Sequence, residues 1–340
     1  MLKFQFRKKE RHFILGILLC CSMLLSGCGG KSLSVMDTQL KSAQDNQQSD
    51  FGKTYQLEPV SKDICVIPTE QSTTATDEAI SAKAALLINE TENTLIFAKN
   101  VYTKQYPASV SKIVTALLAL EEGHLEDMVT VSREAAGITE PGAKLCGFQE
   151  GDKISMEDLL YCLLVYSGND AAIAIAEHIS GSVDSFAEQM NRRMAELGVF
   201  KTHFTNPHGL HEKKHYTTAY DLYLVFHELL KYKEFRQIIQ TTSYTAKWTD
   251  GAGEEHTLSM TSSEAFLNGS ATVPDGIQVE GGKSGTTINA GSCMILLTQD
   301  EEEKEYISVI LKAPSSTEAC TQMSHLLGYI QADSVEGNDS

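Results

Sequence analysis

Pairs of short apolar runs, each pair joined by a polar turn, lie near both ends of the folded part of the chain. Residues 84–89 and 94–99 are separated by four polar residues, and this pattern predicts a β-hairpin. Residues 291–298 and 306–312 flank an acidic turn and predict a second hairpin. Both ends of the sequence therefore supply strands, and we expect these strands to form one antiparallel sheet.

The residues between the hairpins follow a helical period instead. Capping boxes at Ser155/Asp158 and Thr218/Asp221 mark two helix starts. Gly198 lies at the position expected for a helix C-cap. The predicted helices there are 156–166, 170–178, one that contains Phe186, Met190 and Leu197, and one from Thr218 to about Lys231. A further predicted helix, 317–329, follows the second hairpin. The helix at 170–178 is apolar on every side, so we expect it to be fully buried. The sequence predicts an α+β fold with a functional cleft between the sheet and this helical lobe.

Residues 1–27 are typical of an export signal. Five Lys and Arg side chains and one Glu precede an apolar run at 13–25. That run makes a helix of about 20 Å, shorter than the roughly 30 Å hydrocarbon core of a membrane. Leu25-Ser26-Gly27-Cys28 resembles the bacterial lipoprotein box, which implies cleavage before Cys28 and a lipid on its sulfur. The alternative is an ordinary signal peptide that contains a cysteine.

The rest of the chain divides by composition into three parts. Residues 28–60, rich in Ser, Gln and Asp, are typical of a flexible linker. Residues 61–332 hold the predicted elements and form the folded body, and residues 333–340 form an acidic tail. A lipid on Cys28 predicts a protein anchored to the extracytoplasmic face of the bacterial cell membrane without spanning it.

The charge and the cysteines narrow the possible functions. The 340 residues are 42% apolar, so global disorder is excluded, and a net charge of −17 excludes a nucleic-acid partner because phosphates are repelled. The cysteines that remain after removal of the signal and lipidation are Cys65, Cys146, Cys162, Cys293 and Cys320. This number is odd and no C-x-x-C spacing occurs, so we expect no obligatory disulfide and no zinc site. Cys162 and Cys293 lie in apolar runs, and we expect them to be buried.

The first candidate motif is Ser109-Val110-Ser111-Lys112, which follows Pro107 and precedes an apolar run. The pattern predicts a helix that begins near Ser109. Residues three apart share a helix face, so the Lys112 amine can reach the Ser109 hydroxyl. Serine is a weak nucleophile until a base takes its proton, and lysine is a base only when uncharged. The alternative is a capped amphipathic helix with a solvated lysine, since S-x-x-K alone is common.

The second motif, Ser167-Gly168-Asn169, lies between two predicted buried helices. A hydroxyl and an amide in such a break are well placed to point into a cleft. There the hydroxyl can relay a proton to a leaving amine, and the amide can orient a substrate carbonyl. The alternative is that Asn169 is a helix N-cap.

The third motif is the glycine-rich segment 282–287, which precedes a strand. Glycines let another backbone approach closely, so a substrate peptide can lie there as an added edge strand. Lys283 supplies a positive charge suited to a carboxylate. The alternative is a hairpin loop with an exposed lysine.

The order S-x-x-K, S-x-N and K-[ST]-G resembles that of the penicillin-recognising serine acyl-transferases. Within this group the sequence most resembles the D-alanyl-D-alanine carboxypeptidases, which are the low-mass penicillin-binding proteins. The resemblance covers residues 60 to 330 and includes segments 204–210 and 216–222. It implies a β-lactamase/transpeptidase-like fold. It also implies an acyl-enzyme that removes the C-terminal D-alanine of peptidoglycan stem peptides, inhibition by β-lactams, and no cofactor or metal.

The resemblance also implies roles for individual residues. In the first two motifs it implies four catalytic residues: Ser109 as nucleophile, Lys112 as general base, Ser167 as proton relay and Asn169 as the orienting group. In the third motif it implies a substrate-binding strand formed by Lys283, Ser284, Gly285 and Thr286. The backbone N–H groups of Ser109 and Thr286 would form the oxyanion hole.

Departures from the family pattern occur at both the site and the chain ends. Ser284 stands where the family usually has Thr, and either hydroxyl can donate a hydrogen bond. No arginine follows Arg236, although some relatives use one there for the substrate carboxylate. Many relatives also carry a further C-terminal domain and anchor, and we expect the lipid on Cys28 to take the place of that anchor.

Rival functions remain. A class A-like β-lactamase shares the three motifs but needs a glutamate in an E-x-x-L-N setting to activate the deacylating water, and we expect no such segment between Asn169 and Lys283. A non-catalytic secreted binding lipoprotein is the second rival. A metal site would have to come from a set of histidines in a polar loop: His203, His208, His211 and His215. We favour the carboxypeptidase, acting as a monomer.

Overall fold

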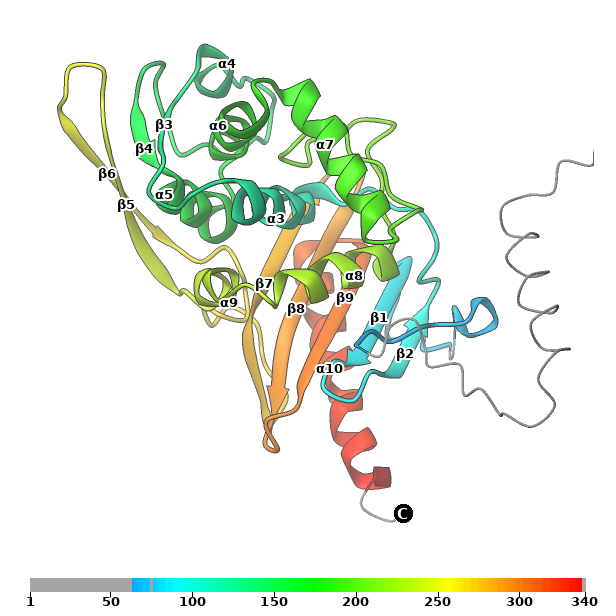
Figure 1. The fold of residues 1–340 in the computed structure, drawn as a ribbon. Helices are drawn as coiled ribbons and strands as arrows, with labels where there is room; N and C mark the ends of the chain where they lie inside the picture. The colour runs from blue at the N-terminus through cyan, green and yellow to red at the C-terminus, as the bar shows by residue number, and fades with distance from the viewer. Residues whose placement is uncertain (1–62, 74–75, 338–340) are drawn as a thin grey trace, which may run out of the picture. The chain divides into compact units, whose positions relative to one another are not determined.

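The structure is a computed structural model that describes residues 63–73 and 76–337 (Figure 1). These residues fall within one compact unit, Ser61–Ser340. The predicted export signal, Cys28 and the linker lie outside the described residues. Within the part of the chain that is described, no helix has the length and apolar character needed to cross a membrane.

A five-stranded antiparallel sheet joins the two ends of the described chain. Its order is β2 (Thr94–Lys99), β1 (Ala84–Asn89), β9 (Glu305–Ala313), β8 (Gly291–Asp300) and β7 (Ile277–Thr287). The predicted hairpins are confirmed as β1–β2 and β8–β9. Leu86 of β1 faces Val309 of β9, so the first and last strands of the sequence pair at the centre of the sheet.

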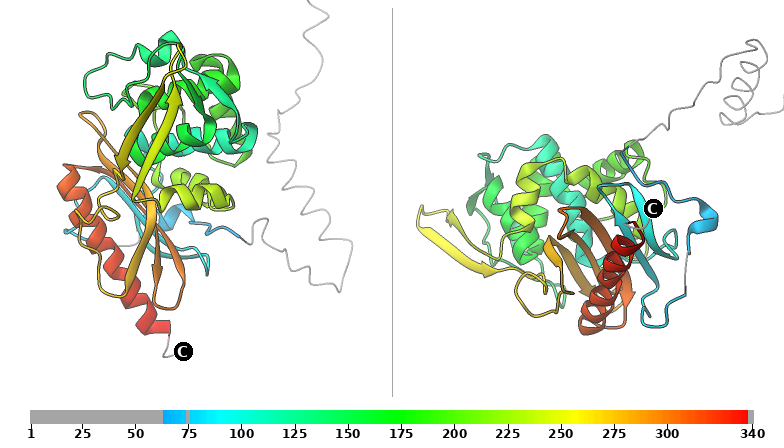
Figure 2. Two further views of the ribbon diagram at one scale, coloured as in Figure 1. Left: turned by 90° about the vertical axis from the view of Figure 1, so that its left-hand side faces the viewer. Right: turned by 90° about the horizontal axis from the view of Figure 1, so that it is seen from below.

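Both faces of this sheet are buried, because alternate side chains enter two different cores. Leu86 and Ile88 of β1 belong to a core shared with the helical lobe, whereas Ala85 and Leu87 pack in a core with α10 (Ser316–Gly337). Figure 2 shows α10 on one face of the sheet and α8 (Ala219–Leu229) on the other. Burial of each such leucine contributes about 1.5–3 kcal/mol, so the period of two fixes the register of the strands.

The helical lobe contains the predicted helices of the middle of the chain, whereas the predicted helix 317–329 is α10, which lies on the other face of the sheet and extends to Gly337. Its elements in the described chain are α3 (Lys112–Glu122), α4 (Arg133–Ala136), α5 (Met156–Tyr161), η3 (Cys162–Tyr166), α6 (Asn169–Ser180), α7 (Val183–Glu196), α8 and α9 (Lys233–Ile239), with the 3-10 turn η2 (Ala108–Ser111). A further 3-10 turn, η1 (Thr69–Gln71), precedes β1. The capping interactions at Ser155 and Thr218 are confirmed, since each side chain accepts a backbone N–H three residues on. The prediction that the helix at 170–178 is fully buried is wrong at its end: burial stops at Ala176, and His178 is exposed because α6 emerges from the lobe.

A second sheet was not predicted. It has four antiparallel strands in the order β3 (Met128–Thr130), β4 (Lys153–Ser155), β5 (Ser243–Thr249) and β6 (Glu255–Thr261). The expectation of a single sheet is therefore wrong. These strands are short or largely exposed, so they lack the apolar runs that identified the main sheet.

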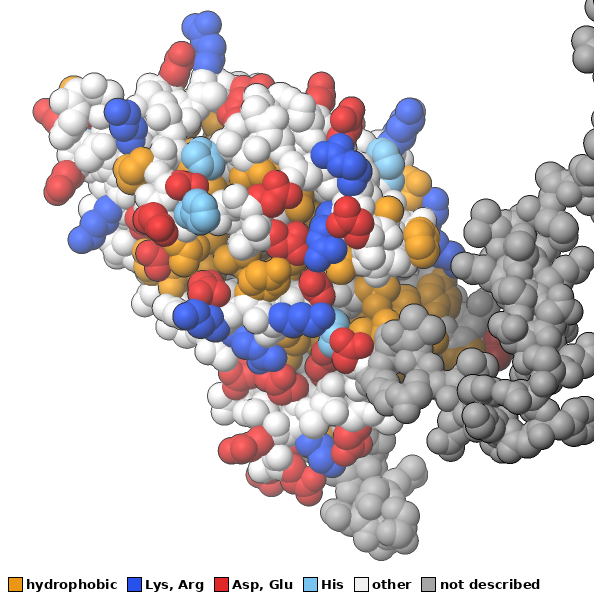
Figure 3. Space-filling view, viewed as in Figure 1, with side chains coloured by type: hydrophobic (Ala, Val, Ile, Leu, Met, Phe, Trp, Pro, Cys, Tyr) orange, Lys and Arg blue, Asp and Glu red, His pale blue; other side chains and the backbone are white. Residues whose placement is uncertain are grey.

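The five cysteines of the described chain are free thiols. Cys162 and Cys293 are buried, as predicted from the apolar runs that contain them. Figure 3 shows acidic and basic side chains interspersed on the surface of the face seen in Figure 1.

Candidate active site

The first motif forms a tight turn at the start of a buried helix. Residues Ala108–Ser111 form the 3-10 turn η2, and α3 begins at Lys112, three residues later than the predicted helix start. Ser109 is half-buried and lines a cavity, whereas Lys112 is completely buried. The turn therefore separates an accessible hydroxyl from an amine that solvent does not reach.

The Lys112 amine is surrounded by three oxygens. Its Nζ lies 3.1 Å from Ser109 Oγ, 2.6 Å from Asn169 Oδ1 and 2.7 Å from the backbone carbonyl oxygen of His208. Two of these partners come from segments far from Lys112 in the sequence. The geometry thus brings the first two motifs together and adds a backbone group that carries no sequence signal.

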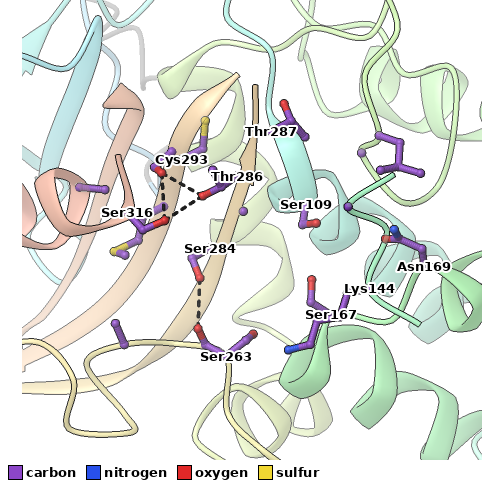
Figure 4. Close-up of a pocket in the computed structure, with 18 of the residues that line it drawn as sticks. Ser109, Lys144, Ser167, Asn169, Ser263, Ser284, Thr286, Thr287, Cys293 and Ser316 are labelled. Carbon is purple, nitrogen blue, oxygen red and sulfur yellow. Dashed lines mark hydrogen bonds between the residues drawn. The ribbon is translucent and has the colours of Figure 1, made fainter. Parts of the chain in front are cut away.

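The second motif begins where regular helix ends. The predicted helix 156–166 is only partly α-helical: α5 stops at Tyr161, and η3 continues as a π-helical turn. Ser167 then adopts the left-handed conformation, with φ 75° and ψ 34°. The alternative in which Asn169 is an N-cap is wrong, because Gly168 occupies the cap position and the Asn169 side chain contacts Lys112 instead. The break thus turns both polar side chains toward the cleft (Figure 4).

The third motif lies inside strand β7 and not in a hairpin loop. Lys283 is 1% exposed, which excludes the alternative of an exposed lysine, and its Nζ donates to the Ser284 carbonyl at 2.7 Å. Gly285 lies against the first motif: a Cβ built at this position would be 2.4 Å from Ser109 N. The missing side chain therefore lets β7 touch the turn that carries Ser109.

These segments border one cavity of about 320 Å³ between the sheet and the helical lobe (Figure 4). Its lining includes one or more residues of each motif, namely Ser109, Ser167, Asn169, Ser284, Gly285 and Thr286. Lys112 and Lys283 are buried below this surface. The structure thus brings all eight predicted site residues of the body to one place, whereas Cys28 lies outside the described residues.

Burial and mutual repulsion shift the pKa values of the charged groups here. Burial lowers the pKa of Lys112 far below its usual value, and the positive charge of Lys283 lowers it further. Burial lowers the pKa of Lys283 to about 8, against the opposing effect of the negative charge of Glu264. The same burial raises the pKa of Glu264 to about 7. The site therefore holds an amine poised to be uncharged beside a second amine that is still cationic at neutral pH.

Comparison with known proteins agrees with this arrangement. Residues 70–315 match the sequence profile of the peptidase family S11, described as D-alanyl-D-alanine carboxypeptidase. The chain belongs to this family. The matched residues include all three motifs, so the carboxypeptidase family is identified by the segments that build the cavity.

Individual family members extend the comparison. The chain is 32% identical over 257 residues to D-alanyl-D-alanine carboxypeptidase DacF of Bacillus subtilis, covering 74% of this chain and 62% of that one. It is 30% identical to DacA of Haemophilus influenzae, covering 71% and 59%. The chain thus spans about three fifths of the length of these curated relatives.

Solved structures show the predicted fold. The Streptomyces K15 DD-transpeptidase superimposes with a TM-score of 0.70 at 26% identity, over 76% of this chain and all of that one. Penicillin binding protein 5 from Haemophilus influenzae gives a TM-score of 0.65 at 28% identity, over 75% and 72%. The prediction of a transpeptidase-like α+β fold is therefore confirmed.

His215 and His208 of the polar loop make hydrogen bonds within the protein. His215 Nε2 lies 2.7 Å from Ser111 Oγ, and its Nδ1 accepts the N–H of Thr205 at 3.1 Å. Burial lowers the pKa of both His208 and His215 to about 3, so both rings are neutral. Among the described residues no three metal-binding side chains form a cluster, and the loop instead presents the His208 carbonyl to Lys112.

Several residues of the site were missed from the sequence. Asp170 is buried, and its carboxylate accepts the N–H groups of Cys146 and Gly147, which ties their loop to the second motif. Gly209 has φ +88°, and a Cβ there would be 1.9 Å from the Ala108 carbonyl oxygen, so this glycine lets the histidine loop touch the turn η2 that carries Ser109. A glycine in a tight loop indicates from the sequence that such a close contact is possible, but it does not show which residue lies on the other side of the contact.

One expectation needs correction. The sequence does contain an E-x-x-L-N segment between the second and third motifs, at 264–268. Its glutamate is 3% exposed and is not among the described residues that line the cavity. Lys283 is the cation that lowers its pKa, and the Glu264 charge is not among those that shift the pKa of Lys112. The groups of the site that act on the Glu264 carboxylate are therefore Lys283 and Ser284 of the third motif.

Proposed function

We propose that the protein is a serine-type D-alanyl-D-alanine carboxypeptidase that removes the C-terminal D-alanine from peptidoglycan stem peptides through an acyl-enzyme on Ser109. The observation that carries this proposal is the set of three oxygens around the buried Lys112 amine. Family membership and the match of all three motifs support it.

The geometry around Lys112 suits an uncharged amine. A neutral amine has two N–H donors and one lone pair. The two short contacts, to Asn169 Oδ1 and the His208 carbonyl, accept both N–H groups. The lone pair is then directed at Ser109 Oγ, 3.1 Å away, whose hydroxyl can donate to it. Burial and Lys283 both favour this state, so Lys112 fits the role of general base.

The reaction then follows in two steps. Lys112 takes the proton of Ser109, whose oxygen attacks the carbonyl carbon between the two D-alanines, while the N–H groups of Ser109 and Thr286 stabilise the oxyanion. Collapse breaks the C–N bond, and the proton held by Lys112 passes through the Ser167 hydroxyl to the departing amine, so Lys112 is uncharged again. Water then attacks the ester carbonyl and gives one proton to Lys112. Collapse breaks the ester C–O bond, and that proton returns to Ser109 Oγ as the shortened peptide is released.

Strand β7 fits the role of substrate platform. Ser284, Gly285 and Thr286 present two hydroxyls and open backbone along one side of the cavity, and the cation of Lys283 is buried beneath them. A peptide backbone can align with this strand, and Asn169 can orient its carbonyl from the opposite side. A β-lactam fits the same place, since opening of its ring by Ser109 leaves a stable ester.

The location of the substrate fits the sequence of the N-terminal segment. Stem peptides lie outside the cytoplasmic membrane, so the enzyme acts on the extracytoplasmic side. We place its attachment there at a lipid on Cys28, with residues 28–60 as a tether. The net charge of −17 is compatible with a body that does not adsorb to an anionic membrane surface.

The decisive experiment uses the soluble body and an acetylated peptide that ends in D-Ala-D-Ala. The wild-type protein is expected to release D-alanine and to bind fluorescent penicillin covalently, and Ser109→Ala to do neither. Retention of penicillin labelling by Ser109→Ala would remove this serine from the role of nucleophile.

The two rival functions are tested in the same series. Rapid hydrolysis of a chromogenic cephalosporin, without D-alanine release, would favour the β-lactamase. Absence of both labelling and D-alanine release in the wild-type protein would favour a non-catalytic binding lipoprotein.

A further inference from the structure

The wall of the cavity carries a cation that the proposed reaction does not use. Among the described residues that line the cavity, Lys144 is the only one with a charged side chain. This is unexpected in a chain with 45 acidic residues and a net charge of −17. A lone cation facing such a cavity suits an anionic part of the ligand.

Lys144 is held firmly on this wall. Its backbone carbonyl accepts the N–H of Asn169 at 2.7 Å, which ties it to the second motif. Its Nζ lies 4.2 Å from the centre of the Tyr166 ring, so the side chain is supported from below by an aromatic face. Among the described side chains no carboxylate lies within ion-pair distance of it. Partial burial lowers the pKa of Lys144, a cost that an anionic ligand would offset.

The position of Lys144 indicates which end of the substrate it meets. Figure 4 shows Lys144 beside Ser167, on the wall that faces Ser284 across the cavity. In the proposed reaction Ser167 gives its proton to the departing amine, so the leaving D-alanine lies against Ser167. The carboxylate of that residue is one Cα away from the amine. It therefore falls in the corner that Lys144 shares with Ser167.

The arginines of the described body do not compete for this role. Each pairs with a glutamate, and none lines the cavity: Arg133 with Glu150, Arg192 with Glu188, Arg193 with Glu121 and Arg236 with Glu305. No arginine follows Arg236 in the sequence. Recognition of the terminal carboxylate thus has to come from lysine and hydroxyl groups.

We propose that Lys144 is the specificity residue that binds the terminal carboxylate of the leaving D-alanine, an inference that rests on the proposed carboxypeptidase function. The ammonium group would pair with the carboxylate opposite the hydroxyl of Ser284. Selection of a free C-terminus, and so carboxypeptidase over endopeptidase cleavage, follows from this contact.

The test compares two substrates that differ in one charge. The first is diacetyl-L-Lys-D-Ala-D-Ala, whose sole charged group is the terminal carboxylate, and the second is its C-terminal amide. Lys144→Met keeps the aliphatic stem on Tyr166 but removes the charge. We expect kcat/KM on the acid to fall about 10- to 100-fold, and kcat/KM on the amide to stay unchanged. Lys144→Arg is expected to retain most of the activity on the acid.

Two features of the design isolate the carboxylate contact. The charge of Lys144 also lowers the pKa values of Lys112 and Lys283, so both substrates are measured at one pH and the acid-to-amide ratio is compared. Lys201→Met is the matched control, since Lys201 rests on the ring of Tyr102 and lies outside the cavity lining. If the wild-type protein hydrolyses the amide too slowly, its inhibition constant against the acid peptide replaces kcat/KM.

The outcomes separate this inference from the function on which it rests. An equal loss on acid and amide, or no loss on the acid, overturns the role of Lys144 while the carboxypeptidase stands. A loss confined to peptides with additional carboxylates further upstream also overturns it, because the anion recognised is then not the terminal one. A wild-type protein that neither releases D-alanine nor binds penicillin overturns both proposals.

Discussion

At the scale of single residues, the environment of Lys112 favours the uncharged amine that the proposed role of base requires. In water its amine would be charged at neutral pH and could not accept a proton. Complete burial, two carbonyl acceptors and the nearby Lys283 together favour the uncharged amine. The S-x-x-K spacing alone predicts the contact with Ser109, but the pKa shift depends on groups that only the fold brings together.

Removal of the Lys112 amine should therefore suppress acylation without removing the nucleophile. We expect Lys112→Ala to lower the rate of covalent labelling by fluorescent penicillin by about 10²- to 10⁴-fold, the usual contribution of a positioned base. Lys104→Ala serves as control, because this exposed lysine lies over the Tyr216 ring outside the cavity lining. Near-normal labelling of Lys112→Ala would exclude the lysine as base.

Glu264 should set the alkaline limit of activity. Acylation needs uncharged Lys112, which is lost as the pH falls, and cationic Lys283, which is lost as the pH rises through its pKa of about 8. The negative charge of Glu264 raises the pKa of Lys283. We expect Glu264→Gln to move the alkaline limb of the acylation pH profile downward by about one unit or more.

The comparison for this profile is Glu254→Gln, a change at an exposed turn. It is expected to leave both limbs in place. An alkaline limb that stays fixed in Glu264→Gln would show that Lys283 does not depend on this carboxylate.

At the scale of secondary structure, the site depends on the contact between β7 and the turn η2. Gly285 permits this contact, since no side chain separates the strand from Ser109. Thr286, the next residue of β7, lines the same cavity as Ser109, as the proposed oxyanion hole requires. The position of a sheet relative to a helix is thus set by the absence of a single methyl group.

Gly285→Ala should separate these two elements. A Cβ 2.4 Å from Ser109 N forces β7 or η2 to move, and we expect a loss of about 1–3 kcal/mol in the free energy of unfolding. Acylation should fall about 100-fold or more, because displacements near 1 Å are costly at reacting groups. Thermal unfolding and penicillin labelling measure the two effects.

A second glycine gives the matched control. Gly328 lies in α10, and a Cβ there meets no atom within 4 Å. Gly328→Ala is expected to raise the free energy of unfolding by about 0.5–1 kcal/mol through helix propensity and to leave acylation unchanged. Equal acylation rates in the two variants would argue against the close contact.

The elements differ in how far the sequence could predict them. Strands β1 and β2 were predicted with correct bounds because alternation and a polar turn are local signals. The turn η3 was not, since a π-helical turn arises from packing at the end of α5 and has no sequence period of its own. The second sheet escaped because its strands bury few residues. In the site, the three motifs predicted the side chains that meet. The contact of the His208 carbonyl with Lys112 and the close approach of Gly285 to Ser109 became visible only in the tertiary structure.

At the scale of the whole molecule, the proposed lipid determines where the enzyme meets its substrate. The mature protein would carry its catalytic body on the predicted linker, residues 28–60. Such a tether would raise the effective concentration of the protein near the membrane.

Attachment can be tested by a change at Cys28. We expect Cys28→Ser to abolish incorporation of labelled fatty acid and to shift the protein from the membrane fraction to the soluble exported fraction. Cys21→Ser, within the predicted signal, should behave as the wild-type protein. A Cys28→Ser protein that still sediments with membranes would indicate another means of attachment.

The pairing of β1 with β9 imposes an order on biogenesis. Glu305 N donates to Thr91 Oγ1 across 214 residues of sequence, so the first strand leaves the ribosome long before its neighbour exists. Closing so long a loop is slow. Strand β7 joins the sheet through β8 and β9, so its contact with Ser109 depends on the same late strands. Nearly the whole chain must therefore be synthesised before the site can form. We expect the incomplete nascent chain to have no hydrolytic activity during its export.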